Sequence, residues 1–180
     1  MEISQPISSE ELDLAPVFGE LDEATKERVL DELRRADATL AAVRDELEFE
    51  GVPLTLEQYP SGQTEVVAHL TGADGKLSFE AGLRPRNFFS ESPWHPGRPP
   101  RAMMTDAWDI DGAVRVTVRK LVGTHKYTIQ ETGAEIDEQR FEGPVEAATG
   151  FAAACEQLAE LARSRAPTVE AWAPPDEEEG

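Results

Sequence analysis

The sequence has little that binds metals or forms cross-links. It has one cysteine, Cys155, and three histidines that stand in separate segments, His69, His95 and His125. A single cysteine excludes an internal disulfide, and the scattered histidines form no zinc-binding pattern. A lone cysteine in an alanine-rich stretch is typical of a small core residue. We therefore expect no metal site and no cofactor.

Long apolar runs and targeting signals are also missing. No stretch approaches the ~18 apolar residues that a membrane-spanning helix needs. The N-terminal stretch MEISQPISSEELDL is acidic and lacks the basic and apolar regions of a secretory signal. These features predict a cytoplasmic protein that does not associate with membranes.

Catalytic motifs do not stand out. The sequence has no nucleotide-binding loop, no dinucleotide fingerprint and no nucleophile elbow. Asp109 and Asp111 are two residues apart, but the remaining ligands of a calcium loop do not accompany them. The sequence leaves enzymatic activity open and favours its absence, so we assign no catalytic residue.

Charge is abundant and unevenly placed. The chain holds 36 acidic and 17 basic residues, which gives a formal net charge of −19. Such a field repels phosphates, so we expect no direct binding of nucleic acid. Residues 84–126 hold eight basic and four acidic residues, a net +4, which leaves −23 on the rest of the chain. Arginine outnumbers lysine 13 to 4, a bias typical of GC-rich bacterial genomes.

A long helix is predicted over residues 22–48. Asp22 is a suitable N-cap, and Gly51 and Pro53 follow the expected end. One apolar seam repeats at alternating steps of four and three residues and consists of Val29, Leu33, Ala36, Leu40, Val43 and Leu47. The seam either lies across a β-sheet or pairs with another subunit.

Beyond Pro53 the apolar residues alternate with polar ones, which predicts β-strands. The expected strands cover residues 54–59, 64–70, 76–83, 102–110, 113–121 and 125–132, with a further short strand at 139–142. Asp111-Gly112 is predicted to be a tight hairpin turn between two of them. Val114, Val116 and Val118 should face the core, with Arg115 and Arg119 on the opposite, solvent-exposed face of the sheet.

A second helix should begin at Pro144 and end before Pro167, packing through small side chains. The expected fold is an α+β domain over residues 21–166. It holds an antiparallel β-meander of about five to six strands, with the long N-terminal helix and the C-terminal helix packed on one face. Residues 1–20 are predicted to be a mobile acidic tail, and residues 167–180 an acidic, proline-rich tail.

The most unusual stretch is 84–101, RPRNFFSESPWHPGRPPR, which holds five prolines, four arginines and one acid. Proline favours extended backbone, and arginine and aromatic side chains dominate binding hot spots. The stretch is interpreted either as a crossover loop that packs on its own body or as a recognition loop. With the neighbouring strands it supplies the candidate partner-binding residues: Arg84, Arg86, Phe88, Phe89, Trp94, His95, Arg98, Arg101, Arg115 and Arg119.

The leading hypothesis is a non-catalytic protein-binding module, such as an adaptor, a chaperone-like protein or an immunity-type protein. It would dock a protein partner on the loop and on the wet face of the sheet, and could form a homodimer through the 22–48 helix or the sheet face. One alternative is an enzyme or small-ligand protein that holds an anion with Arg84, Arg86, Arg115 and Arg119. A second is an acidic mimic of nucleic acid.

Overall fold

The structure, a computed structural model, describes residues 3–7, 12–51, 54–58, 64–72, 77–88, 104–122 and 125–171. Along the chain the elements are β1 (Ile3–Pro6), α1 (Ala15–Phe18), α2 (Glu23–Leu47), β2 (Leu54–Gln58), β3 (Thr64–Gly72), β4 (Leu77–Phe88), β5 (Met104–Val122), β6 (His125–Phe141) and α3 (Pro144–Ala171). Among the described residues, no helix is both long and apolar enough to cross a membrane.

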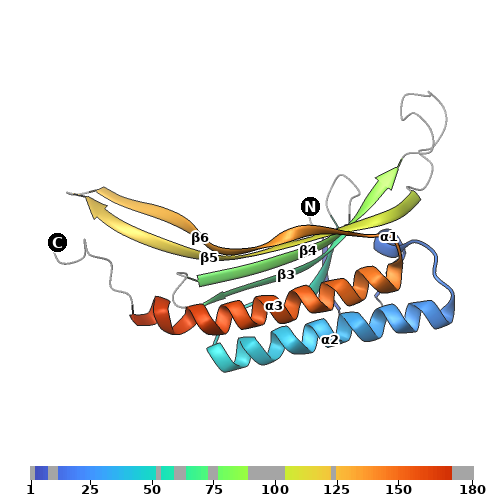
Figure 1. The fold of residues 1–180 in the computed structure, drawn as a ribbon, viewed down its shortest axis with the longest axis horizontal. Helices are drawn as coiled ribbons and strands as arrows, with labels where there is room; N and C mark the ends of the chain where they lie inside the picture. Colours follow the sequence, from blue (N-terminus) through green and yellow to red (C-terminus); the bar gives the residue numbers. More distant parts are fainter. Residues whose placement is uncertain are drawn as a thin grey trace.

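The six strands form one antiparallel sheet whose spatial order, β1 to β6, follows the sequence. The long helices α2 and α3 run side by side on one face of this sheet (Figure 1). The α+β meander with both helices on one face is therefore confirmed. We call the face turned away from α2 and α3 the outer face.

Helix α2 begins as its sequence predicts. The Asp22 carboxylate accepts a hydrogen bond from the Thr25 backbone N–H at 2.7 Å, which caps the helix and lowers the pKa of Asp22. Five of the six seam residues are fully buried, and Leu47 is partly buried. The seam packs chiefly against α3 of the same chain, so it leaves no open apolar stripe for a second subunit.

Helix α3 presents small side chains to α2 and to strands β4 and β5. Cys155 lies on this buried face, and burial raises the pKa of its thiol well above the ordinary value. The predicted end before Pro167 is wrong, because α3 continues through Pro167 to Ala171. Pro167 removes one N–H donor from the helix ladder, and α3 nevertheless extends four residues beyond it.

The first 20 residues also differ from the predicted mobile tail. Strand β1 pairs with β2, and the apolar residues Ile7, Leu12, Leu14, Val17 and Phe18 are buried in the main core. The Trp108 indole N–H of β5 donates to the Val17 carbonyl at 2.9 Å, and its ring lies 5.9 Å from that of Phe18. Burial of these side chains outweighs the acidic residues between them, so the domain begins before residue 21.

The hairpin predicted at Asp111-Gly112 is wrong as well. Residues 104–122 form one continuous strand, β5, and residues 125–141 form its partner, β6. The pairing register between these strands shifts next to Gly112 and again after Val114. A β-carbon on Gly112 would lie 3.2 Å from the Glu80 carbonyl oxygen, so this glycine permits close packing at a bulge.

Asp37 on α2 gives a prediction about pH. Burial raises the pKa of this carboxyl, although Arg44 and the Leu54 backbone N–H favour its charged form. The folded protein therefore binds this proton more tightly than the unfolded chain, and the stabilising effect is lost as the pH rises through the folded pKa. We expect Asp37→Asn to raise the urea midpoint modestly at pH 7 and to have no such effect near pH 3, below the ordinary pKa of 3.8.

The matched control for this experiment is Asp31→Asn, which removes the same charge from an exposed position of α2. It separates the burial of Asp37 from a general relief of repulsion in this acidic protein. Equal midpoints for the two variants at pH 7 would contradict the burial argument.

Candidate partner-binding face

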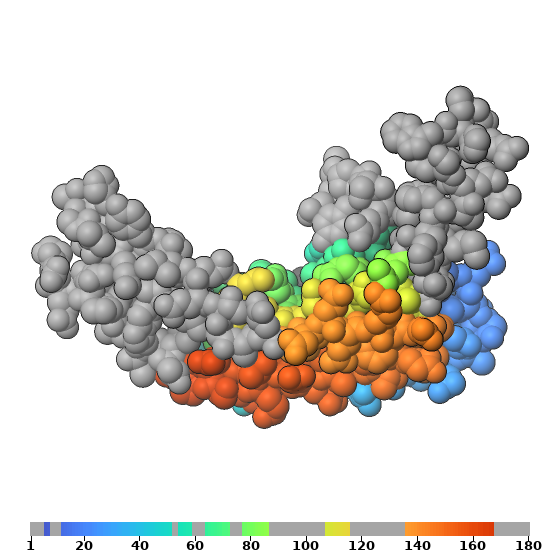
Figure 2. Space-filling view, turned by 45° about the horizontal axis from the view of Figure 1, so that its top comes forward, coloured from blue at the N-terminus to red at the C-terminus, as the bar shows by residue number. Residues whose placement is uncertain are grey.

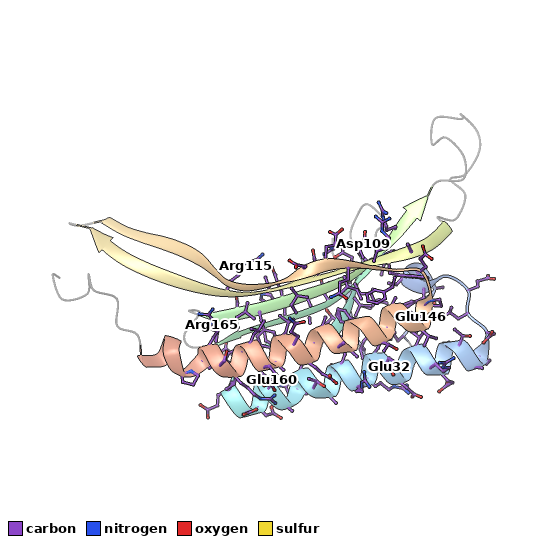
Figure 3. The ribbon with its side chains drawn as sticks, in the orientation of Figure 1. Glu32, Asp109, Arg115, Glu146, Glu160 and Arg165 are labelled. Carbon is purple, nitrogen blue, oxygen red and sulfur yellow. The ribbon has the colours of Figure 1, made fainter. Side chains whose placement is uncertain are left out.

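The outer face carries alternate residues of β3, β4 and β5. Their neighbours in sequence are buried against the helices, so the period of two separates a charged outer row from an apolar inner row. Figure 2 looks obliquely onto the molecule, with β3, β4 and β5 (green to yellow) above α3 (orange to red). Figure 3 shows Asp109 and Arg115 on the outer side of the sheet, opposite Glu32 and Glu160 on the helices.

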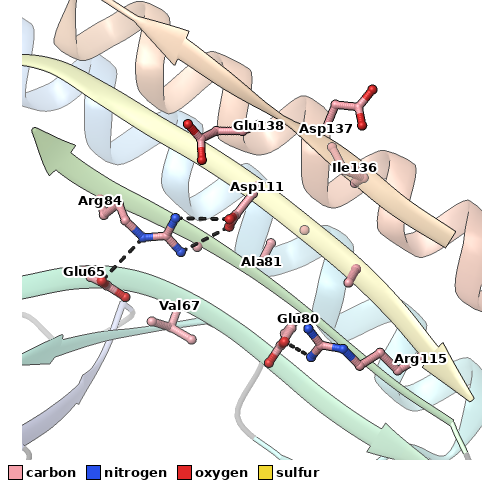
Figure 4. Close-up of a pocket in the computed structure, with 13 residues that line it drawn as sticks. Glu65, Val67, Glu80, Ala81, Arg84, Asp111, Arg115, Ile136, Asp137 and Glu138 are labelled. Atoms are coloured by element: carbon pink, nitrogen blue, oxygen red, sulfur yellow. Dashed lines mark hydrogen bonds and ion pairs between the residues drawn. The ribbon is translucent and has the colours of Figure 1, made fainter. Parts of the chain in front are cut away.

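The first charged row on this face crosses three strands at Glu65, Arg84 and Asp111. The Arg84 guanidinium donates two hydrogen bonds to the Asp111 carboxylate, at 3.1 and 3.2 Å, and its Nε lies 3.4 Å from Glu65 Oε1 (Figure 4). The bond to Asp111 raises the pKa of Arg84 further, which keeps this group charged. Gly82 makes room for the guanidinium, since a β-carbon there would lie 2.8 Å from Arg84 Nη2.

A second row runs parallel to the first. The Asp109 carboxylate lies between Arg86, at 3.4 Å, and Arg140, at 3.6 Å, so it joins β4 to β6. Arg115 forms a further ion pair with Glu80 across β4 and β5. Because each of these arginines contacts a carboxylate, four acids and four arginines neutralise one another on the outer face.

Between these ion pairs the outer face is hollowed, with a volume of about 450 Å³. The charged residues that line this hollow are Glu65, Glu80, Arg84, Asp111, Arg115, Asp137 and Glu138. They comprise five acids and two arginines, a net charge of −3. Asp137 and Glu138 are exposed on β6, at the register shift opposite Ile110 and Gly112 (Figure 4).

The chemistry of this face is ion pairing at a shallow surface that none of the described helices covers. No family model, curated protein or solved structure matches the chain. Within the part of the chain that the structure describes, no group of three or more histidine, cysteine, aspartate or glutamate side chains is placed to hold a metal ion. The charges of this face are spread over the four strands β3 to β6.

The structure brings together three of the predicted site residues. Arg84, Arg86 and Arg115 all lie on the outer face, on β4 and β5. Phe88 and Arg119 are placed by their backbone alone, near the end of β4 and along β5. The other five predicted residues lie outside the described part of the chain: Phe89, Trp94, His95, Arg98 and Arg101.

Sequence reasoning did not place on this face the acids that pair with these arginines. Glu65, Glu80, Asp109 and Asp111 alternate with apolar residues along their strands, so their position on the wet face could have been inferred. Their pairing could not, because it depends on the register between strands. The stretch that is basic in sequence is consequently balanced on the outer face by acids from neighbouring strands.

Proposed function

We propose that this protein is a non-catalytic protein-binding module that docks a basic segment of a partner on the outer face. The observation that supports this proposal is the hollow on the outer face, which no described helix covers and whose described lining has an excess of carboxylates. An open, hollowed sheet face with spread charges suits a polypeptide better than a small substrate, which is usually enclosed by a deep apolar pocket.

The ion pairs indicate the sign of the partner's charge. An anionic ligand would have to compete with Glu65 and Asp111 for Arg84, and with Glu80 for Arg115. A cationic side chain would instead meet Asp137 and Glu138, for which no ion pair to another described residue is found. Charge complementarity of this kind steers association and selects partners more than it adds affinity.

The same pairing disfavours an acidic mimic of nucleic acid. Such a mimic presents unbalanced negative charges to a basic groove, whereas four outer-face acids here contact arginines of the same chain. The contribution of residues 89–101 to binding stays a prediction, as does that of Arg119.

A titration of the isotope-labelled protein with a basic peptide of alternating lysine and valine tests the proposal. We expect amide chemical shifts to change around Glu65, Glu80 and Asp111 and at Asp137 and Glu138. The double variant Asp137→Lys/Glu138→Lys should weaken binding about tenfold at low salt, which corresponds to roughly 1.4 kcal/mol. Added salt should weaken binding by the wild type, because exposed charges are screened.

The matched control is Glu27→Lys/Asp31→Lys, which makes the same change in net charge at exposed positions of α2, on the opposite side of the protein. This variant should bind the peptide almost as the wild type does. If both double variants weaken binding equally, or if the shifts spread over the helices, the attraction is one of net charge alone and the proposed face is wrong.

A further inference from the structure

The last part of the β5–β6 pair extends beyond the rest of the sheet. Strand β4 pairs with β5 only as far as Leu77, opposite Val116. From Thr117 to Val122, β5 pairs with residues 125–130 of β6 and with no other described strand. This two-stranded segment, which we call the ribbon, curves away from α3 in Figure 1. Two strands alone are marginally stable in water, so the ribbon needs a further surface to pack on.

The register divides the ribbon into two rows. Val116 and Val118 follow Val114 at steps of two along β5, and Val114 is fully buried in the core. Val118 lies opposite Ile129, and Lys120 lies opposite Tyr127. The apolar inner row of the sheet, to which Val114 belongs, therefore continues into the ribbon, where most of its residues are apolar.

The other row of the ribbon is polar. It follows Arg115 and consists of Thr117, Arg119 and Leu121 opposite Gln130, Thr128 and Lys126. A ribbon with one apolar row and one polar row resembles half of a packed pair of sheets, in which the apolar row is the buried one.

The charge of the ribbon favours a second copy of this chain over other partners. Residues 117–130 contain Arg119, Lys120 and Lys126 and no acid, a net +3, so the rest of the chain carries −22. Two copies repel each other over most of their surface, because both carry a large negative charge. The positively charged ribbon of one copy would instead be attracted to the acidic body of the other copy. Its six residue pairs span about 20 Å, enough for the tip to reach that body when two ribbons cross.

We propose that the ribbon is a dimerisation arm. Two copies pack the apolar rows of their ribbons on each other about a two-fold axis, so that each copy contributes the same row to the interface. The basic tip of each ribbon lies against the acidic body of the other copy. This interface is separate from the hollow on the outer face and does not depend on the proposed function.

Light scattering after size-exclusion chromatography, with sedimentation velocity, tests this arm. The wild type should have twice the monomer mass of 19.8 kDa. Val118→Glu/Ile129→Glu places two charges in the apolar row and should raise the dimer dissociation constant about 100-fold. Thr117→Glu/Gln130→Glu makes the same charge change in the polar row of the same strands and should largely retain the dimer.

A shortened chain is the control for the case in which the charged variants fail to fold. Replacing residues 118–129 by Asn-Gly joins the opposed residues Thr117 and Gln130 through a tight turn. This chain should be a monomer with the circular dichroism and cooperative unfolding of a folded body. A monomeric wild type over the whole concentration range, a shortened chain that still dimerises, or equal dissociation of the two charged variants would overturn the proposal.

Discussion

Removal of residues 1–20 should abolish cooperative unfolding of the domain. Five apolar side chains of this segment, from Ile7 to Phe18, are at most 9% exposed. Burial of one large apolar side chain contributes about 1.5–3 kcal/mol, whereas a whole domain is typically stable by only about 5–15 kcal/mol. The truncated chain should therefore show no sharp transition in urea by circular dichroism. A transition at the wild-type midpoint would show that the segment lies outside the core.

Single substitutions measure how much individual contacts of this segment contribute to the stability of the domain. Phe18→Ala should cost about 3–5 kcal/mol, because it leaves a cavity beside Trp108. Trp108→Phe should cost about 1–3 kcal/mol, because it leaves the Val17 carbonyl without its hydrogen bond. The control Glu20→Ala lies in the same segment but is exposed, so it should change stability by less than about 0.5 kcal/mol.

Among the sheet glycines whose surroundings the structure describes, Gly72 should tolerate alanine least. A β-carbon on Gly72 would overlap the ring of Phe49, which is buried and lies 5.8 Å from the ring of Phe79. Phe49 is held in place by its backbone N–H, which donates to the Arg44 carbonyl, and by the Glu50–Thr71 bridge beside it. Because the ring is buried and these contacts fix its backbone, we expect a loss of about 1–3 kcal/mol in urea unfolding.

A double-mutant cycle with Phe49→Leu tests whether the ring is the cause. In a strand, alanine is normally favoured over glycine by about 0.5–1 kcal/mol. Gly72→Ala should therefore become harmless or stabilising once the ring is gone. Additive losses within about 0.5 kcal/mol would show that the ring and the β-carbon do not meet.

The parts of the fold that depend on local periodicity could be predicted from the sequence. The seam from Val29 to Leu47 identified α2 and its buried face, and alternation identified β2, β3 and the start of β4. These signals succeed because each buried face repeats with the period of its own backbone. The six main strands expected match the number in the structure only because two errors offset each other: β1 was missed, and β5 was divided into two. The further short strand expected at 139–142 is the end of β6.

The division of β5 has a physical cause. Asp-Gly is a strong hairpin signal, but it also suits a bulge in a long strand, where Asp111 reaches Arg84 and Gly112 fits against Glu80. A hairpin turn and a bulge differ here only in whether a long neighbouring strand, β6, pairs along the whole segment. That pairing is set by the tertiary structure. The contact of Val17 and Phe18 with Trp108 was likewise hidden, since Trp108 lies 91 residues away from Val17 in the sequence.

The strand order has a consequence for synthesis on the ribosome. Every strand pairs with its neighbour in sequence, so the sheet can grow from β1 to β6 as the chain emerges. Helix α2 is complete at Leu47, but α3, which covers most of its seam, begins only at Pro144. At a synthesis rate of about 5–20 residues per second, the seam of α2 stays exposed for roughly 5–20 seconds before α3 is made. Aggregation of nascent chains, or capture by a holdase, therefore centres on α2 during that interval.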